Sequence, residues 1–261
     1  MLRVGQIPYL NSEPFYFGLA ASAGTNVELH PLAPRLMGQL AAEGGLDAGL
    51  FSLMDSVRLG DRFEPLGDFC IACDGEVQSV LFFARRPIEK MAGATVAVTG
   101  ETATSVVLLK LLLPGHYALK DVRYVDMGSG EAADGCLLIG DEALRRRQGI
   151  EGLPHRYDLA EEWSAWQGLP FVFARFMVRT SADGAEKAAL QEALAQRLRA
   201  NLGNLDAIGR VRRDLGMTVA EIKTYLQGFS FELGERERGG MEAFLRLARP
   251  LVAEEAAHAG G

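Results

Sequence analysis

The chain has 261 residues and a 48% hydrophobic composition, enough to bury a large core as one large domain or as two lobes. Its 27 Lys and Arg stand against 34 Asp and Glu, a net charge of -7, and no basic run is long enough to follow a phosphate backbone, which argues against nucleic acid as a partner. The longest apolar stretches, such as residues 106–113, fall short of the roughly 20 residues that span a bilayer, so no membrane segment is predicted.

The first residues read as a folded strand. RVGQIPYL lacks the charged, apolar and cleavage regions of a signal peptide, so with Met1 as the native start we expect a cytoplasmic protein. Three cysteines, Cys70, Cys73 and Cys136, form no disulfide framework, and we expect structural roles for them. The four histidines show no metal-ligand spacing and are expected on the surface, so no metal site is predicted.

Four short, nearly continuous apolar runs alternate with helical patterns along the chain. They are LRVGQI, DAGLF, TVAVTG and GCLLIGD, and this pattern is typical of βαβ units whose strands are covered on both faces. Each run ends at a polar turn that opens a helix, after Leu10, Phe51, Gly100 and Gly140. Because ligands of open α/β sheets bind at the carboxyl ends of the strands, these four turns are the places where we expect a site.

Two longer apolar runs, residues 77–86 and 169–179, are rich in β-branched and aromatic residues and lack a following Gly-rich turn. They read as paired crossovers between two lobes. This interpretation predicts a first lobe of residues 1–84 plus 176–261, and a second, inserted lobe of residues 85–175, with a ligand cleft between them.

The C-terminal part of the chain is predicted to be helical. Apolar residues recur at helical spacing over residues 186–205 and again from Thr218, where Thr218 and Glu221 predict a capping box. A last helix has a weak middle at Gly239–Gly240. We expect these helices to serve packing alone and the tail, residues 257–261, to be disordered.

The segment GETATS leads from the third apolar run into a strongly apolar helix. Free backbone NH groups and the hydroxyls of Thr102, Thr104 and Ser105 would converge on a helix N-terminus and form an anion cradle. The segment lacks a Walker lysine and a GxGxxG string, which favours a carboxylate over a nucleotide. The alternative is an ordinary N-cap, where Ser and Thr are common.

FSLMDS and IGDEAL have the same form, a strand followed by a polar turn and a helix. Ser52 and Asp141 therefore join the candidate site. Asp55 and Asp141 could equally be helix caps favoured by the helix dipole. Ser79, inside the first crossover run, would face the cleft if the lobes close.

IPYLNSEPFYFGL is the most informative of the four turns. Asn11 and Ser12 can each cap the helix that follows, yet a cap needs only one such residue. Asn11 offers an amide that both donates and accepts hydrogen bonds. Aromatic walls would come from Tyr9, Phe15 and Tyr16.

A strand ending in YLN, followed closely by Pro and then GL, resembles the opening of the chorismate dehydratase family, the MqnA-type enzymes of the futalosine route to menaquinone. DAGLFSLMDSVR, VQSVLFFAR, ETATSVVLLKLLL, LLIGDEAL and YDLAEEWSAWQGLPFVFARFMVR resemble further family segments in the same order, over most of the chain. Leu53 and Met54 depart from the proline and aromatic residue often found there, which leaves the backbone of that wall open. The sister family that makes dihydroxynaphthoate opens with an SPCPND-like segment and relies on a cleft histidine, and no histidine here follows a cleft strand.

The resemblance implies a two-lobed α/β fold like that of type II periplasmic binding proteins. It also implies an enzyme that removes water from chorismate, a dicarboxylate, to give 3-[(1-carboxyvinyl)oxy]benzoate without a metal or organic cofactor. Asn11 is expected to stabilise the departing hydroxyl or the developing charge. The residues expected to bind the substrate are Tyr9, Ser12, Ser52, Ser79, Thr102, Thr104, Ser105 and Asp141.

The proton acceptor stays open at this point. The candidates are a carboxylate of the substrate itself, Glu13, Glu101, Asp55 and Asp141. The alternative function is a non-catalytic binding protein for a small carboxylated solute, which would share fold, hinges and anion cradle. A ligand-sensing domain is a third possibility, although no DNA-binding or signalling module is attached.

Overall fold

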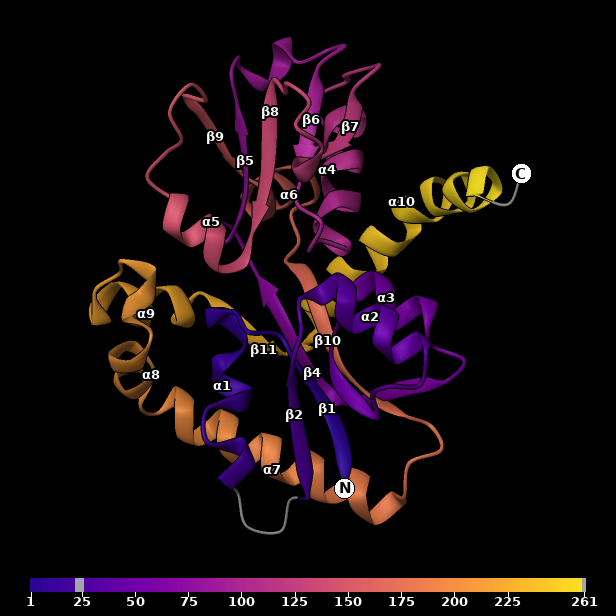
Figure 1. The fold of residues 1–261 in the computed structure, drawn as a ribbon, viewed down its shortest axis with the longest axis vertical. Coiled ribbons are helices and arrows are strands. Elements are labelled where there is room, and N and C mark those ends of the chain that lie inside the picture. The colour runs from indigo at the N-terminus through magenta and orange to yellow at the C-terminus, as the bar shows by residue number, and fades with distance from the viewer. Residues whose placement is uncertain (22–25, 260–261) are drawn as a thin grey trace.

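A computed structural model describes residues 1–21 and 26–259 and shows two lobes stacked along the long axis of the molecule (Figure 1). Each lobe is built on one mixed sheet, with the strand order β11-β4-β10-β3-β1-β2 in the first and β7-β6-β8-β5-β9 in the second. The strands are β1 Leu2–Gln6, β2 Val27–Pro31, β3 Ala48–Ser52, β4 Phe63–Cys73, β5 Val80–Ala84, β6 Thr95–Val98, β7 Arg123–Asp126, β8 Gly135–Ile139, β9 His155–Asp158, β10 Phe171–Arg179 and β11 Phe229–Glu232.

Helices cover both sheets and continue into the C-terminal part. They are α1 Glu13–Tyr16, α2 Pro34–Ala42, α3 Leu53–Arg58, α4 Thr104–Gly115, α5 Gly140–Arg146, α6 Leu159–Gln167, α7 Gly184–Leu202, α8 Leu205–Val211, α9 Val219–Gln227 and α10 Glu235–Ala259. No helix in the described part of the chain is both long enough and apolar enough to cross a membrane.

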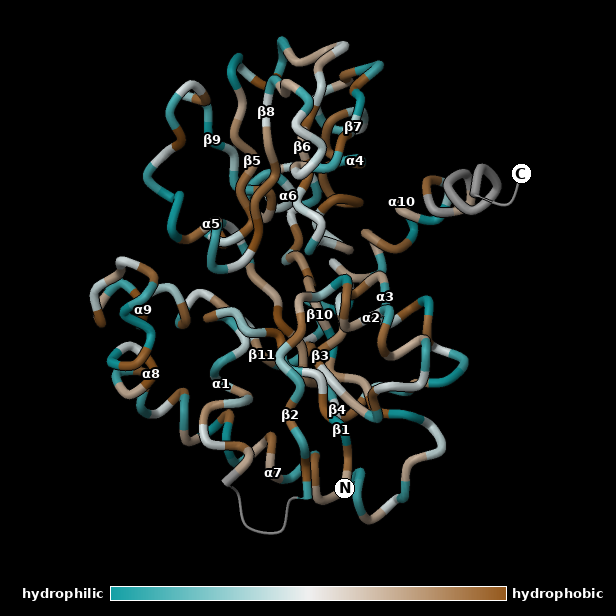
Figure 2. Tube along the Cα trace, in the orientation of Figure 1, coloured by the Kyte–Doolittle hydropathy of each residue, from teal (hydrophilic) through white to brown (hydrophobic). Residues whose placement is uncertain are grey.

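The four apolar runs are confirmed as strands β1, β3, β6 and β8, and a helix or 3-10 turn follows each of them. β1 runs parallel to β3, and β6 runs parallel to β8. Hydrophobic residues concentrate in the strands of both sheets and hydrophilic ones in the outer loops (Figure 2). The continuous apolar pattern of β3 reflects burial of all five of its residues.

The two longer runs are not paired with each other. β5 lies between β8 and β9 in the second sheet, whereas β10 pairs with β3 and β4 in the first. Of these two partners, β4 is a strand that the sequence did not predict. β5 belongs to the second sheet and the whole of β10 to the first, whereas the expected limits put β5 in the first lobe and divided β10 between the two. We propose that the chain crosses between the lobes at residues 74–79 and 168–170.

Helix α10 is anchored where the second crossover enters the first sheet. Trp163, Phe171 and Phe244 are fully buried and meet edge to face, with ring centroids 5.0–6.0 Å apart. The expected weak middle at Gly239–Gly240 is instead a close approach, because a Cβ on Gly240 would lie 2.0 Å from the Pro170 carbonyl oxygen. The expected disorder of the tail is wrong for residues 257–259, which are helical, and residues 260–261 lie outside the described chain.

Helices α8 and α9 bridge the two lobes. The capping box of Thr218 and Glu221 is confirmed at the start of α9. Apolar side chains of the two helices form one cluster with Leu10 of the first lobe and Leu144 of the second. Burial of this cluster therefore depends on both lobes at once.

Candidate functional site

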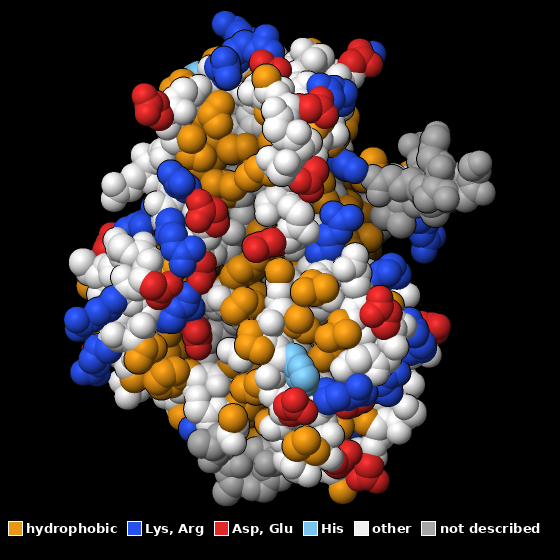
Figure 3. Space-filling model, viewed as in Figure 1, with side chains coloured by type: hydrophobic (Ala, Val, Ile, Leu, Met, Phe, Trp, Pro, Cys, Tyr) orange, Lys and Arg blue, Asp and Glu red, His pale blue; other side chains and the backbone are white. Residues whose placement is uncertain are grey.

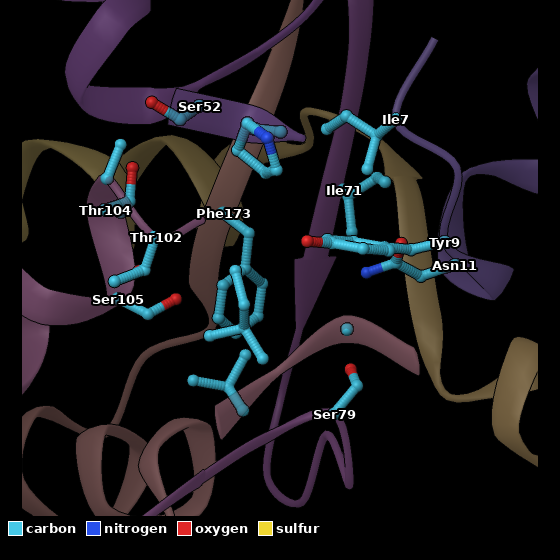
Figure 4. Close-up of a pocket in the computed structure, with 16 residues that line it drawn as sticks. Ile7, Tyr9, Asn11, Ser52, Ile71, Ser79, Thr102, Thr104, Ser105 and Phe173 are labelled. Atoms are coloured by element: carbon cyan, nitrogen blue, oxygen red, sulfur yellow. The ribbon is translucent and has the colours of Figure 1, made fainter. Parts of the chain in front are cut away.

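The four predicted turns meet at one cavity between the lobes (Figure 4). The space enclosed by its walls is about 500 Å³, a figure that includes the open mouth. Apolar wall residues that the sequence did not single out include Ile71 of β4 and Phe173 of β10, the two strands next to the crossovers. The predicted site residues that line it are Tyr9, Asn11, Ser52, Ser79, Thr102, Thr104 and Ser105.

Asn11 lies on the 3-10 turn Leu10–Ser12 and does not cap a helix. No side chain caps this turn or α1 that follows it. The Oδ1 atom of Asn11 is buried and has no hydrogen-bond partner. Figure 4 shows the amide nitrogen of Asn11 directed into the cavity. Because a buried polar atom without a partner is energetically unfavourable, the amide is suited to a polar ligand.

Ser12 is buried behind the cavity wall and does not line it. Its hydroxyl donates to the carbonyl oxygens of Ile7 and Tyr9, the second over 2.9 Å, and so fixes the turn that carries Asn11. The expected aromatic walls also differ, because Phe15 and Tyr16 pack into the core of the first lobe. Both residues belong to the short helix α1 and are buried against the first lobe, which spacing alone did not reveal.

Tyr9 closes the cavity from the side of the first lobe. Its hydroxyl donates to the Glu101 carboxylate of the second lobe. Burial, followed by this hydrogen bond, raises the pKa of Tyr9 above its ordinary value, so the phenol stays neutral. Gly140 permits the close packing of the ring, since its φ is +60° and a Cβ there would lie 2.6 Å from the Tyr9 ring.

The hydroxyls at the start of α4 divide between two tasks. Thr104 Oγ1 accepts a hydrogen bond of 3.1 Å from the Met54 backbone NH, so it joins the lobes. Thr102 Oγ1 is buried without a partner, and Ser105 Oγ points into the cavity (Figure 4). No side chain caps α4, and the first NH groups of a helix have no partner within it. This wall is suited to a carboxylate.

The turn after β3 is a capped helix start, but the capping side chain is Ser52 and not Asp55, the residue that the alternative interpretation named. Ser52 Oγ accepts from the Asp55 NH at 3.1 Å and donates to the Asp55 carboxylate at 2.8 Å. Arg58 completes the pairing of that carboxylate at 2.8 Å. Ser52 therefore forms part of the cavity wall, but its hydroxyl is already hydrogen-bonded to Asp55.

Asp141 does not line the cavity and does not cap α5. Its Oδ1 accepts from the Leu10 NH at 2.9 Å, and its Oδ2 pairs with Arg212. Arg212 also pairs with Glu13 at 3.1 Å. This carboxylate of the second lobe thus holds the turn that carries Asn11. Local sequence offered no sign of the interaction, because Arg212 lies 71 residues further along the chain.

The cavity itself is uncharged. Among the described residues that line it there is no Asp, Glu, Lys, Arg or His. Acidic and basic side chains gather on the left side of the view, where the two lobes meet (Figure 3). Outside the cavity, Arg145 pairs with Asp214 at 3.1 Å. No group of His, Cys, Asp and Glu in the described chain is arranged to hold a metal ion.

Two lobes, two crossovers and a cavity between them define this protein as one with the periplasmic-binding-protein fold. Similar solved structures include a protein from Archaeoglobus fulgidus, with a TM-score of 0.78 and 15% identity over 97% of this chain and 98% of that one. Another is the periplasmic aliphatic sulphonate binding protein SsuA from Escherichia coli, with a TM-score of 0.65 and 12% identity over 98% and 92% of the two chains. At these identities the likeness concerns the fold alone.

The chain belongs to the family described as "Menaquinone biosynthesis", whose model matches residues 2–250. Chorismate dehydratase of Thermus thermophilus is 33% identical over 230 residues, which cover 81% of this chain and 83% of that protein. The 1,4-dihydroxy-6-naphtoate synthase of the same organism is 26% identical over 259 residues, 94% and 92% of the two chains. The family resemblance of the sequence motifs is thereby confirmed.

Proposed function

We propose that this protein is a carbon–oxygen lyase that removes water from chorismate to give 3-[(1-carboxyvinyl)oxy]benzoate in menaquinone biosynthesis. The observation that carries the proposal is the 33% identity to a chorismate dehydratase over most of both chains. The relative that makes dihydroxynaphthoate is more distant, at 26% identity. The described histidines also lie away from the cavity, in agreement with the dehydratase assignment.

The reaction breaks a ring C–OH bond and the neighbouring C–H bond, and water leaves as the ring becomes aromatic. Much of the driving force therefore resides in the substrate. The protein has to orient the ring, exclude water and stabilise the departing oxygen. A cavity with apolar walls and a few neutral donors is suited to these tasks.

Asn11 is proposed to act on the departing hydroxyl. Its Oδ1, which has no partner in the protein, can accept a hydrogen bond from the hydroxyl group of the bound substrate. Its Nδ2 can donate to the same oxygen as negative charge develops there. Because the amide is neutral, it does this without repelling a dianionic substrate.

One substrate carboxylate is proposed to bind at the start of α4. Thr102 Oγ1 lacks a partner in the protein, Ser105 Oγ points into the cavity, and NH groups of the first helical turn add further donors. The positive end of the helix dipole favours an anion there. This arrangement holds a carboxylate without any Lys or Arg in the cavity.

The proton acceptor is proposed to be a carboxylate of the substrate. Glu13 and Asp141 are paired with Arg212, and Asp55 is paired with Arg58. Glu101 accepts a hydrogen bond from the Tyr9 hydroxyl. None of these four carboxylates lines the cavity.

Two amides of chorismate, one at each carboxylate, test this assignment. The amide at the reacting carboxylate should bind and resist dehydration, whereas the other should still react, although more weakly bound. If both amides are dehydrated at the rate of chorismate, the acceptor belongs to the protein.

The alternative function is a non-catalytic binding protein for a small carboxylated solute. SsuA, a binding protein, has a similar fold, and a fold of this kind can serve either function. Incubation of the pure protein with chorismate separates the two functions. An aromatic product lacking one water supports the lyase. Tight binding of chorismate without product supports the binding protein.

A further inference from the structure

A tyrosine from the C-terminal helices reaches the cavity wall. The hydroxyl of Tyr225, in α9, forms a hydrogen bond of 2.9 Å with Ser79 Oγ. Ser79 lines the cavity, and its hydroxyl points into it (Figure 4). The two residues are 146 positions apart, and the sequence analysis had given α9 a packing role alone.

We propose that Tyr225 is a positioning residue that directs the hydroxyl proton of Ser79 toward an oxygen of the bound substrate. The proposal rests on the proposed dehydration of chorismate and adds a residue to that site. Tyr225 does not reach the substrate itself and acts through Ser79.

The hydrogen-bond donors and acceptors around Ser79 support this orientation. Tyr225 is 5% exposed, and a buried phenol must donate its proton to a partner, which in the described structure is Ser79 Oγ. The proton of Ser79 must then point elsewhere. Its acceptor within the protein is the Val77 carbonyl at 3.4 Å, well beyond the usual 2.7–2.8 Å of an O–H···O bond. A substrate oxygen in the cavity would be a better acceptor.

The hydrogen bond from Tyr225 also strengthens Ser79 as a donor. A hydroxyl that accepts one hydrogen bond is polarised and donates a stronger one, most of all in a low-dielectric interior. Ser79 is 1% exposed, so water does not weaken this pair. Tyr225 would donate to Ser79, and Ser79 to the substrate oxygen, in one chain of hydrogen bonds.

Both partners are held firmly. The Tyr225 ring packs edge to face on Phe229 at 5.0 Å and lies in the cluster that bridges the lobes. The Ser79 carbonyl accepts from the Gly140 NH at 2.8 Å, while Asp158 accepts from the NH groups just before it. Rigid placement of the pair is what a positioning role requires.

Tyr225→Phe tests the proposal because it keeps the ring and removes the hydroxyl. We expect kcat for chorismate to fall roughly three- to tenfold, the worth of one hydrogen bond. Tyr16→Phe is the matched control, since this buried hydroxyl donates to the Gly5 carbonyl at 2.8 Å in the core of the first lobe. Its kcat should stay at the wild-type value. Equal losses in the two variants would overturn the proposal.

A double-mutant cycle with Ser79→Ala then separates positioning from a structural role. Because Tyr225 acts through Ser79, Tyr225→Phe should have no further effect on kcat in the Ser79→Ala background. Effects that multiply independently would refute the proposal, as would a Ser79→Ala variant with wild-type kcat. Absence of turnover by the unmodified protein would instead refute the proposed function, and this inference with it.

Discussion

Replacing Asn11 with Ala should impair catalysis without weakening the fold. In the free protein the buried Oδ1 lacks a partner, a loss of about 1–3 kcal/mol relative to a satisfied group. Ala removes this unfavourable atom together with some packing of comparable size. We therefore expect the free energy of unfolding to stay within about 1 kcal/mol of the wild-type value, a Tm shift of about 2–4 °C at most for a chain of this size.

The same substitution removes the group proposed to stabilise the departing oxygen. Loss of one donor of this kind lowers kcat by about 10²–10³, or about 2.7–4 kcal/mol of transition-state stabilisation. Asn11→Asp keeps the shape and introduces a negative charge into a cavity without cations, so it should also raise KM for a dianion.

Thermal unfolding and product formation, measured on the same preparations, check this expectation. A fall in kcat together with an unchanged Tm places Asn11 in the reaction. A variant with near wild-type kcat would refute the assignment, and a large fall in Tm would show that Asn11 supports the fold. An Asp variant that binds chorismate more tightly would contradict the uncharged site.

Three further predictions concern the closure of the lobes and the stability of the fold. Gly240→Ala should destabilise the fold by about 1–3 kcal/mol in denaturant unfolding, because its Cβ would lie 2.0 Å from a backbone oxygen. A Cβ on Gly239 would lie 3.7 Å from its nearest neighbour, a Leu169 side-chain atom, so Gly239→Ala should be neutral or stabilising by up to about 1 kcal/mol. Equal effects of the two substitutions would contradict the packing of α10. Tyr9→Phe removes a hydrogen bond between the lobes and should raise KM for chorismate about two- to tenfold; an unchanged KM would show that this bond does not aid closure. The capping-box NH and hydroxyl hold the pKa of Glu221 at about 2, so this residue stabilises the fold above its ordinary pKa of 4.5 and stops doing so as the pH falls toward 2. The Tm difference between wild type and Glu221→Gln should therefore shrink as the pH is lowered from 6 to 3, and a constant difference would refute the linkage.

Local signals in the sequence predicted the parts of the site that depend on one strand and its turn. Continuous apolar runs identified β1, β3, β6 and β8, and the turns after them carry most of the hydroxyl and amide side chains that line the cavity. The fold class followed from the same alternation and from the family motifs. Such signals are strong because a parallel strand buried on both faces leaves little choice of residue.

Interactions between distant segments escaped the sequence analysis. Asp141 follows a strand at a turn where we expected a substrate-binding residue. Its partners are instead the Leu10 NH and Arg212, which no local pattern connects to it. Tyr225 looked like an ordinary core residue of an amphipathic helix. The pairing of β10 with β4 was also missed, because apolar runs do not specify which sheet they join.

Turnover of chorismate tests the central claim most directly. The purified protein and its Asn11→Ala variant would each be incubated with chorismate, and the products separated and weighed by mass spectrometry. We expect the wild type to form 3-[(1-carboxyvinyl)oxy]benzoate, lighter than chorismate by one water, and the variant to form about 10²–10³ times less per unit time. Recovery of unchanged chorismate from the wild-type reaction would contradict the proposed function.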